Sequence, residues 1–173
     1  MNIVDQQERQ LSKRKDLFNY FAGFVEGEGC FSVSIKPHKQ MKFGWVVDPM
    51  FSIYQHKTNR KVLDLFQNEM HCGYIVSKNG KPDVLVYIVD NRRTLEEVII
   101  PFFSKYKLLG TKWNDFLIFR KIIFMMGQKK HLEKDGLIEI IKLAFQMNQQ
   151  DKGRKYTAEQ IISSLTESSE TTR

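Results

Sequence analysis

Two pairs of strand-like runs, separated by helical runs, are the feature that most constrains the fold of this 173-residue chain. In residues 30–36 apolar and polar residues alternate without a break, which is typical of a half-buried strand. A second run, residues 45–55, follows a polar turn and contains Pro49, which suggests a sheet edge or a bulge. Residues 74–78 and 84–89 flank the turn Asn79-Gly80-Lys81-Pro82. The chain therefore contains two predicted hairpins.

Helical patterns precede each hairpin and follow the second one. Apolar residues recur at helical spacing in residues 17–25 and 62–70, and glycines stand after both runs. From Thr94 onward the pattern is helical again. The order αββαββα, with extra C-terminal helices, predicts an α+β fold in which helices cover one face of an antiparallel sheet and leave its polar face free.

The length and the 42% hydrophobic content suit one domain. We expect a polar leader at residues 1–15, a single domain at residues 16–150, and a C-terminal helix with a disordered polar tail at residues 151–173. The two cysteines, Cys30 and Cys72, lie far apart without metal-ligand spacing, which indicates neither a zinc site nor a disulfide framework.

The formal net charge of +7 favours a polyanionic partner such as nucleic acid, although charge alone does not choose among DNA, RNA and an anionic surface. No stretch approaches the length of a membrane span, and the polar start does not read as a signal sequence. We expect a soluble, intracellular protein with no membrane partner.

The nine residues Phe21-Ala22-Gly23-Phe24-Val25-Glu26-Gly27-Glu28-Gly29 resemble the signature of the LAGLIDADG homing endonucleases. The likeness extends more loosely over residues 17–148, through segments such as Gly73-Tyr74 and Gly110-Thr111-Lys112. It implies the LAGLIDADG fold, with a curved sheet that forms a DNA-binding saddle. Because nothing in the second half repeats the signature, the resemblance implies the single-motif type, which works as a homodimer.

In that family the signature helices of two subunits pack against each other, which would place Phe21, Gly23 and Gly27 at the dimer interface. The spacing agrees, because Gly23 and Gly27 lie four residues apart on one helical stripe, where missing side chains let two backbones approach closely. Glycine inside a helix costs about 1 kcal/mol, which suggests a packing reason. The alternative is that these glycines let the helix pack on its own sheet, or that Gly27 only ends the helix.

The resemblance assigns Glu28 as the metal-binding carboxylate and the carbonyl of Gly27 as a further ligand. Mg²⁺, with Ca²⁺ or Mn²⁺ as substitutes, prefers such oxygen ligands. Glu26 is expected to support structure rather than chemistry. For a single acidic residue at a helix end, an ordinary solvated role is the competing interpretation.

Gln55 and Lys112 match the family's outer polar positions, where an amide and a cation can order water and offset charge in the transition state. Gln55 could instead be an exposed polar residue, and Lys112 could be a surface lysine, because it follows Lys105 and Lys107 in a lysine-rich stretch. A third outer residue stays open among Asn59, Arg60 and Lys61.

The free face of the sheet is the predicted DNA surface, because a two-stranded ribbon fits the major groove. Strand parity and turn position nominate Ser32, Ser34, Lys36, His38, Gln40, Ser52, Tyr54, Lys78, Lys81, Asp83 and Leu85. A polar strand face is often merely solvated, so each of these residues is a weak indication by itself.

The leading hypothesis is a site-specific homing endonuclease that binds a long pseudo-palindromic double-stranded DNA site as a homodimer and hydrolyses both strands with a divalent metal. Family membership implies an intron reading frame, in an organelle (chloroplast or mitochondrion) or a prokaryotic cytoplasm. The alternatives are a non-cleaving nucleic-acid-binding module, either an RNA maturase or a transcription factor, and a basic α+β scaffold without a nucleic-acid role. RNA is the less favoured partner.

Overall fold

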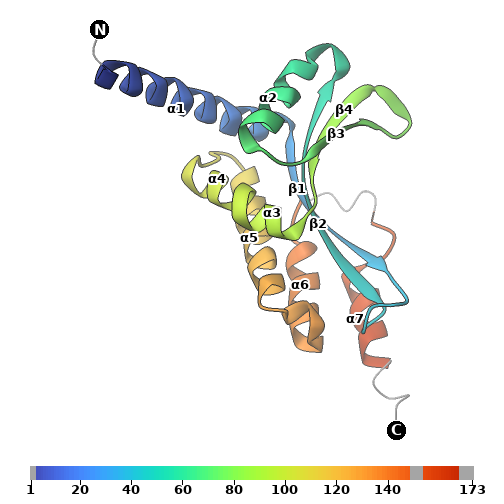
Figure 1. The fold of residues 1–173 in the computed structure, drawn as a ribbon. Coiled ribbons are helices and arrows are strands. Elements are labelled where there is room, and N and C mark those ends of the chain that lie inside the picture. Colours follow the sequence, from blue (N-terminus) through green and yellow to red (C-terminus); the bar gives the residue numbers. More distant parts are fainter. Residues whose placement is uncertain (1–2, 149–153, 168–173) are drawn as a thin grey trace.

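A four-stranded antiparallel sheet with helices on one face makes up the protein in the computed structural model, which describes residues 3–148 and 154–167 (Figure 1). The strands lie in the order β1-β2-β4-β3. Their bounds are β1 Gly29–Pro37, β2 Trp45–His56, β3 Tyr74–Lys78 and β4 Lys81–Val89. The α+β class and both hairpins are therefore as the sequence predicts.

The helical segments alternate with the hairpins and continue after them. In chain order they are α1 Ile3–Glu28, η1 Lys57–Asn59, α2 Arg60–Met70, α3 Arg92–Thr94, η2 Leu95–Ile99, α4 Ile100–Lys105, α5 Lys112–Gly127, η3 Lys130–Leu132, α6 Lys134–Ala144 and α7 Ala158–Glu167. The segment η2 is a π-helical turn between α3 and α4. None of the helices in the described part of the chain is long and apolar enough to cross a membrane.

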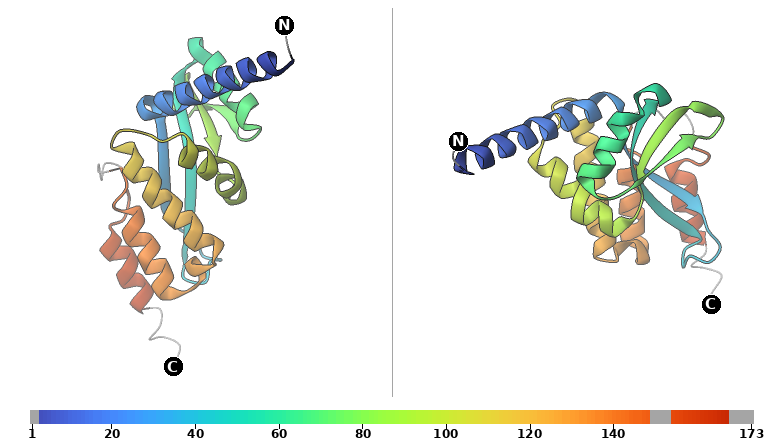
Figure 2. Two further views of the ribbon diagram at one scale, coloured as in Figure 1. Left: turned by 90° about the vertical axis from the view of Figure 1, so that its left-hand side faces the viewer. Right: turned by 45° about the horizontal axis from the view of Figure 1, so that its top comes forward.

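The first helix is longer than the apolar pattern indicates, because residues 3–15, the expected polar leader, form the first half of a 26-residue α1. At about 1.5 Å per residue, α1 is about 39 Å long, and its N-terminal end extends past the rest of the domain (Figures 1 and 2). Its first half is rich in Gln, Glu, Lys and Arg, which are good helix formers even without an apolar stripe. At the other end, α7 provides the expected C-terminal helix, and the predicted disordered tail lies largely outside the described residues.

The core lies between the sheet and the helices. One face of the sheet contributes Phe31, Val33, Phe51, Ile53 and Tyr87, each of them almost completely buried. Side chains from the helices meet this face; Phe31, for example, has Phe103, Phe116 and Phe119 as ring neighbours, with centroids 5.3 to 5.5 Å apart. Large apolar rings at alternate strand positions thus fix which face of the sheet is covered.

The other face of the sheet is called the open face here. Its residues alternate with the core residues and are paired across the strands, as Ser52 with Ile88 and Tyr54 with Val86. It consists of Cys30, Ser32, Ser34 and Lys36 on β1, Val46, Asp48, Met50, Ser52 and Tyr54 on β2, Val84, Val86 and Ile88 on β4, and Tyr74, Val76 and Lys78 on β3.

The C-terminal segment clasps the outer edge of β1. The side-chain amide of Asn148 donates to the carbonyl of Phe31 at 2.9 Å, and the guanidinium of Arg154 donates to the carbonyl of Val33 at 3.3 Å. Because β1 is an edge strand, these carbonyls have no neighbouring strand on that side. The clasp therefore satisfies backbone groups that a sheet edge leaves unpaired.

Candidate active site and DNA interface

Helix α1 ends where β1 begins, and this junction brings the predicted catalytic residues together. Glu28 is the last residue of α1 and is exposed. Gly29, the first residue of β1, pairs with Ile53 on β2, and Gln55 lies two residues further along β2. Gln55 is half-buried, and its side-chain oxygen accepts from the backbone N–H of His56 at 2.9 Å. The sheet register thus places Gln55 beside the end of the signature helix.

Lys112 reaches the same junction from the first turn of α5. Its Nζ donates to the carbonyls of Gly29 at 2.6 Å, Val25 at 3.0 Å and, at the long limit of 3.5 Å, Gly27. The last turn of α1 contains no basic residue of its own, so Lys112 supplies the positive charge that a helix C-terminus favours. Lys112 is therefore not a free surface lysine.

Glu26 has the structural role that the sequence suggested. Its Oε2 accepts a hydrogen bond from the backbone N–H of Leu109 at 2.9 Å. Through this contact it holds the loop at residues 106–111 against α1, directly before Lys112. Glu28, in contrast, has no side-chain hydrogen bond or ion pair with any residue in 3–148 or 154–167.

The junction is polar yet partly enclosed, as Cys30 shows. Burial raises the pKa of the Cys30 thiol, Lys112 opposes the shift and Asp115 adds to it. Asp115 also accepts a hydrogen bond from the backbone N–H of Asn148 at 2.9 Å, which ties α5 to the clasp on β1. The beginning of β1 is thus fixed from three sides by α1, α5 and the C-terminal segment.

The small residues of α1 leave an open stripe, but one predicted interface residue does not lie on it. Gly23 and Gly27 are exposed, and a Cβ atom added at either would meet nothing within 4 Å. The prediction that Phe21 lies at the dimer interface is wrong, because Phe21 is fully buried and stacks on Phe66 with ring centroids 3.8 Å apart. Its side chain belongs to the core of its own domain.

Most of the first hairpin's nominated residues lie where strand parity puts them. Ser32, Ser34 and Lys36 lie on the open face, and Lys36 pairs with Asp48 at 2.5 Å. His38 and Gln40 are exposed in the turn between β1 and β2. Ser52 is the exception, because it is completely buried and its hydroxyl has no partner among the described residues. The prediction that Ser52 contacts DNA is therefore wrong, because its side chain is not accessible on the open face.

The second hairpin requires one further correction. Lys78 lies on the open face, with its Nζ 4.8 Å from the ring centroid of Tyr54, and Lys81 is exposed at the start of β4. Asp83 is exposed and pairs with Lys57, which lowers the pKa of its carboxyl. Leu85 was predicted to bind DNA, but it is buried on the helix-covered face, so this prediction is wrong. The open-face positions of β4 are the even-numbered ones.

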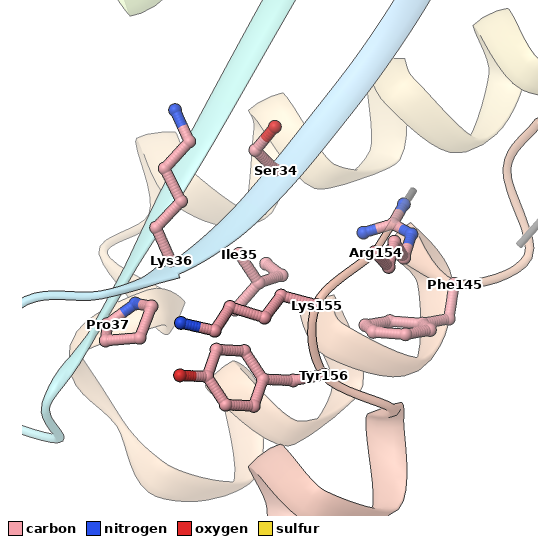
Figure 3. A pocket seen from close by; sticks show the side chains of 8 residues that line it. All are labelled: Ser34, Ile35, Lys36, Pro37, Phe145, Arg154, Lys155 and Tyr156. Atoms are coloured by element: carbon pink, nitrogen blue, oxygen red, sulfur yellow. The ribbon is translucent and has the colours of Figure 1, made fainter. Parts of the chain in front are cut away.

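The sequence did not predict the shallow basic hollow that lies at the edge of β1. It measures about 260 Å³ and is lined by Ser34, Ile35, Lys36, Pro37, Phe145, Arg154, Lys155 and Tyr156 (Figure 3). The guanidinium of Arg154 lies over the Phe145 ring, 4.4 Å from its centroid. Residues of β1 and of the segment before α7, more than a hundred positions apart in the sequence, line this hollow together, which no local sequence pattern would reveal.

The third outer residue at the site is not singled out by the structure. Asn59 precedes α2 as its N-cap without a side-chain cap bond, and Arg60 is engaged with Asp64 one turn further along, at 3.2 Å. Lys61 is exposed. No group of three or more His, Cys, Asp or Glu side chains that could hold a metal ion occurs in the part of the chain that the structure describes.

Comparison with known proteins identifies a family whose sequence model covers the end of α1, both hairpins and Lys112. A family model described as LAGLIDADG endonuclease matches residues 21–123, which begin at the signature and include both hairpins. The chain belongs to this family. The LAGLIDADG match ends within α5, so α6 and α7 lie beyond it.

Several LAGLIDADG relatives resemble the chain over most of its length. The DNA endonuclease I-CeuI of Chlamydomonas moewusii is 34% identical over 83% of this chain, and a probable intron-encoded endonuclease of Neurospora crassa is 34% identical over 75%. This chain spans 66% of the first protein and only 29% of the second. An archaeal intron-encoded homing endonuclease, I-Vdi141I, was solved in complex with DNA; it is 36% identical with a TM-score of 0.82, over 89% of this chain and 97% of that one.

Proposed function

We propose that the protein is a homodimeric, divalent-metal-dependent DNA endonuclease that cuts both strands of a long pseudo-palindromic site. In this proposal each subunit supplies one Glu28, and a two-fold protein presents the same reading surface to each half-site. Relatives that are named intron-encoded support an intron reading frame for this chain too. Such an enzyme would act where its target DNA lies, in an organelle or a prokaryotic cell.

The observation that carries the proposal is the exposed stripe of α1 that leads to Glu28. Tyr20, Gly23 and Gly27 lie on that stripe, and Tyr20 is half exposed. A bare backbone surface on the exposed side of a helix favours a second helix at close range. Since a two-fold axis along this stripe would bring the two helix ends together, it would also bring together the two Glu28 carboxylates, one from each chain.

The donors at the end of α1 suit a hard cation such as Mg²⁺. Glu28 offers an exposed carboxylate, and the Gly27 carbonyl is only weakly engaged, at 3.5 Å from the Lys112 ammonium. Carboxylate and carbonyl oxygens are ligands that Mg²⁺, Ca²⁺ and Mn²⁺ prefer. Such an ion, when bound, would lower the pKa of a water molecule and neutralise charge on the scissile phosphate.

The remaining residues at the junction have separate tasks in this proposal. Lys112 fixes the carbonyls at the end of α1 and brings a positive charge close to the phosphate. Gln55 can orient a water molecule through its side-chain amide, although its oxygen is already used by the His56 N–H. Glu26 positions the loop that precedes Lys112.

The decisive experiment replaces Glu28 with Gln, which removes the charge at nearly constant volume. Purified protein is incubated with the uninterrupted target locus in Mg²⁺ or in EDTA, and binding and cleavage are measured separately. We expect Glu28→Gln to bind DNA but not cleave it. The matched control is Glu26→Gln, which retains an oxygen that can accept the Leu109 N–H. A fully active Glu28→Gln enzyme would refute the assignment, and binding without nicking by the unaltered protein in Mg²⁺ would indicate a non-cleaving module.

A further inference from the structure

The two hairpins present chemically different surfaces on the open face. The β1–β2 hairpin offers hydroxyls and charges, namely Ser32, Ser34, Lys36 and Asp48. The β3–β4 hairpin offers Tyr74 and Val76, which are 43% and 41% exposed, and the half-buried Val84. The half of the open face that β3 and β4 form is therefore largely apolar.

This apolar patch, which consists of Tyr74, Val76 and Val84, is not a continuation of the core. Val76 pairs with Val86 across the strands, so the two side chains lie side by side on the open face. Val86 is only 5% exposed, whereas Val76 is 41% exposed and leaves its methyl groups accessible. A sheet face that meets only water usually has polar side chains, because exposed aliphatic groups gain nothing there. Exposed valine and tyrosine on this face indicate a binding surface that requires apolar groups.

The polar groups around the patch are already engaged within the protein. The hydroxyl of Tyr74 donates to Asp90 at 2.6 Å, which raises the pKa of the phenol. The ammonium of Lys78 lies over the Tyr54 ring, 4.8 Å from its centroid. The centre of the patch thus offers methyl groups and a ring edge rather than hydrogen-bond donors, while Lys78 and Lys81 place positive charge at its margin.

Among the groups on base-pair edges in the major groove, the C5 methyl of thymine is the apolar one. A methyl-rich patch with lysines at its margin fits a thymine-bearing stretch of groove with phosphates on either side. We propose that the β3–β4 hairpin recognises thymine methyl groups through Val76 and Val84, and that these residues determine part of the sequence specificity. This proposal rests on the proposed function, because it assumes that DNA lies on the open face.

The test uses a duplex that the purified protein selects from a randomised library. Each thymine of that duplex is replaced singly by deoxyuridine, which lacks the methyl group but keeps the hydrogen-bonding edge. Binding is measured in EDTA, so that cleavage does not interfere. Burial of one methyl group corresponds to about 0.8 kcal/mol, so we expect about a fourfold increase in Kd at each contacted thymine.

Variants identify which thymines the patch contacts. In Val76→Ala the penalty for deoxyuridine should disappear at the thymines that Val76 contacts and persist at all others, and Val84→Ala should do the same at its own positions. Val76→Thr keeps the volume and replaces one methyl by a hydroxyl, so it should reduce the same penalties. The matched control is Val98→Ala, the same truncation on η2 away from the open face, which should leave the pattern of penalties unchanged.

Two outcomes would overturn the proposal, and they are distinguishable. If the protein cleaves the selected duplex in Mg²⁺ but no penalty depends on Val76 or Val84, methyl recognition by this hairpin is wrong while the endonuclease function stands. If the protein neither selects nor cleaves any duplex, the proposed function fails and this inference fails with it.

Discussion

Replacing Lys112 with Met tests whether this lysine stabilises the end of the signature helix. The change keeps most of the aliphatic stem and removes the ammonium, which makes two short contacts of 2.6 and 3.0 Å with the carbonyls of Gly29 and Val25. A hydrogen bond to a charged group contributes about 1.5 to 3 kcal/mol. Because this end of α1 is partly exposed and its carbonyls can regain water, we expect a net loss of about 2 to 3 kcal/mol in the free energy of unfolding.

The assay is urea unfolding at one fixed protein concentration, because self-association would make the midpoint depend on concentration. With a slope of about 1 to 3 kcal/mol per molar urea, the midpoint should fall by roughly 0.7 to 3 M. The matched control is Lys107→Met, whose Nζ lies 5.9 Å from the centroid of the Trp113 ring and should contribute about 0.5 kcal/mol or less. Equal midpoints for the two variants would contradict the capping role of Lys112.

Three further predictions concern the interface, a turn and a half-buried imidazole. Gly23→Ala should keep or slightly raise the helix stability of the monomer, whereas Gly23→Leu should abolish dimers in sedimentation experiments; a Leu variant that dimerises normally would argue against the stripe. Gly73→Ala should lower the free energy of unfolding by about 2 kcal/mol or more in urea, because φ is +75° and a Cβ would lie 2.6 Å from the carbonyl oxygen of Ile88. Burial and then Arg92 lower the pKa of His131, so the unfolded chain binds the proton first and stability should fall as the pH drops below about 6.5; His131→Gln should flatten that dependence.

The parts of the fold that the sequence predicted correctly are those with an unambiguous period. Residues 30–36 alternate without a fault, and the structure confirms both the strand and its covered face. The first half of α1 lacked such a signal, because charged residues form a helix there without an apolar stripe. Its extent therefore depends on propensity and on continuity with the packed half, neither of which a periodic pattern reveals.

The errors at the site arise from three-dimensional context. Counting from the turn placed Leu85 on the open face, but a register irregularity at Ser77 and Lys78 separates the turn from the regular pairing. Ser52 has the correct parity but is enclosed by its neighbours, and burial depends on residues far away in the chain. Phe21 was grouped with the interface glycines because it belongs to the same motif, although it lies on a different side of the helix.

The clasp on β1 also determines how two copies of this chain can meet. With the outward carbonyls of Phe31 and Val33 occupied by Asn148 and Arg154, that border of the sheet offers little to a second chain that approaches strand to strand. Helix-to-helix association is left as the favoured mode of contact near β1. Asn148→Asp removes the amide donor to the Phe31 carbonyl and would therefore expose the edge of β1 to strand pairing with further chains. The clasp thus opposes edge-to-edge aggregation as well as holding the C-terminal segment in place.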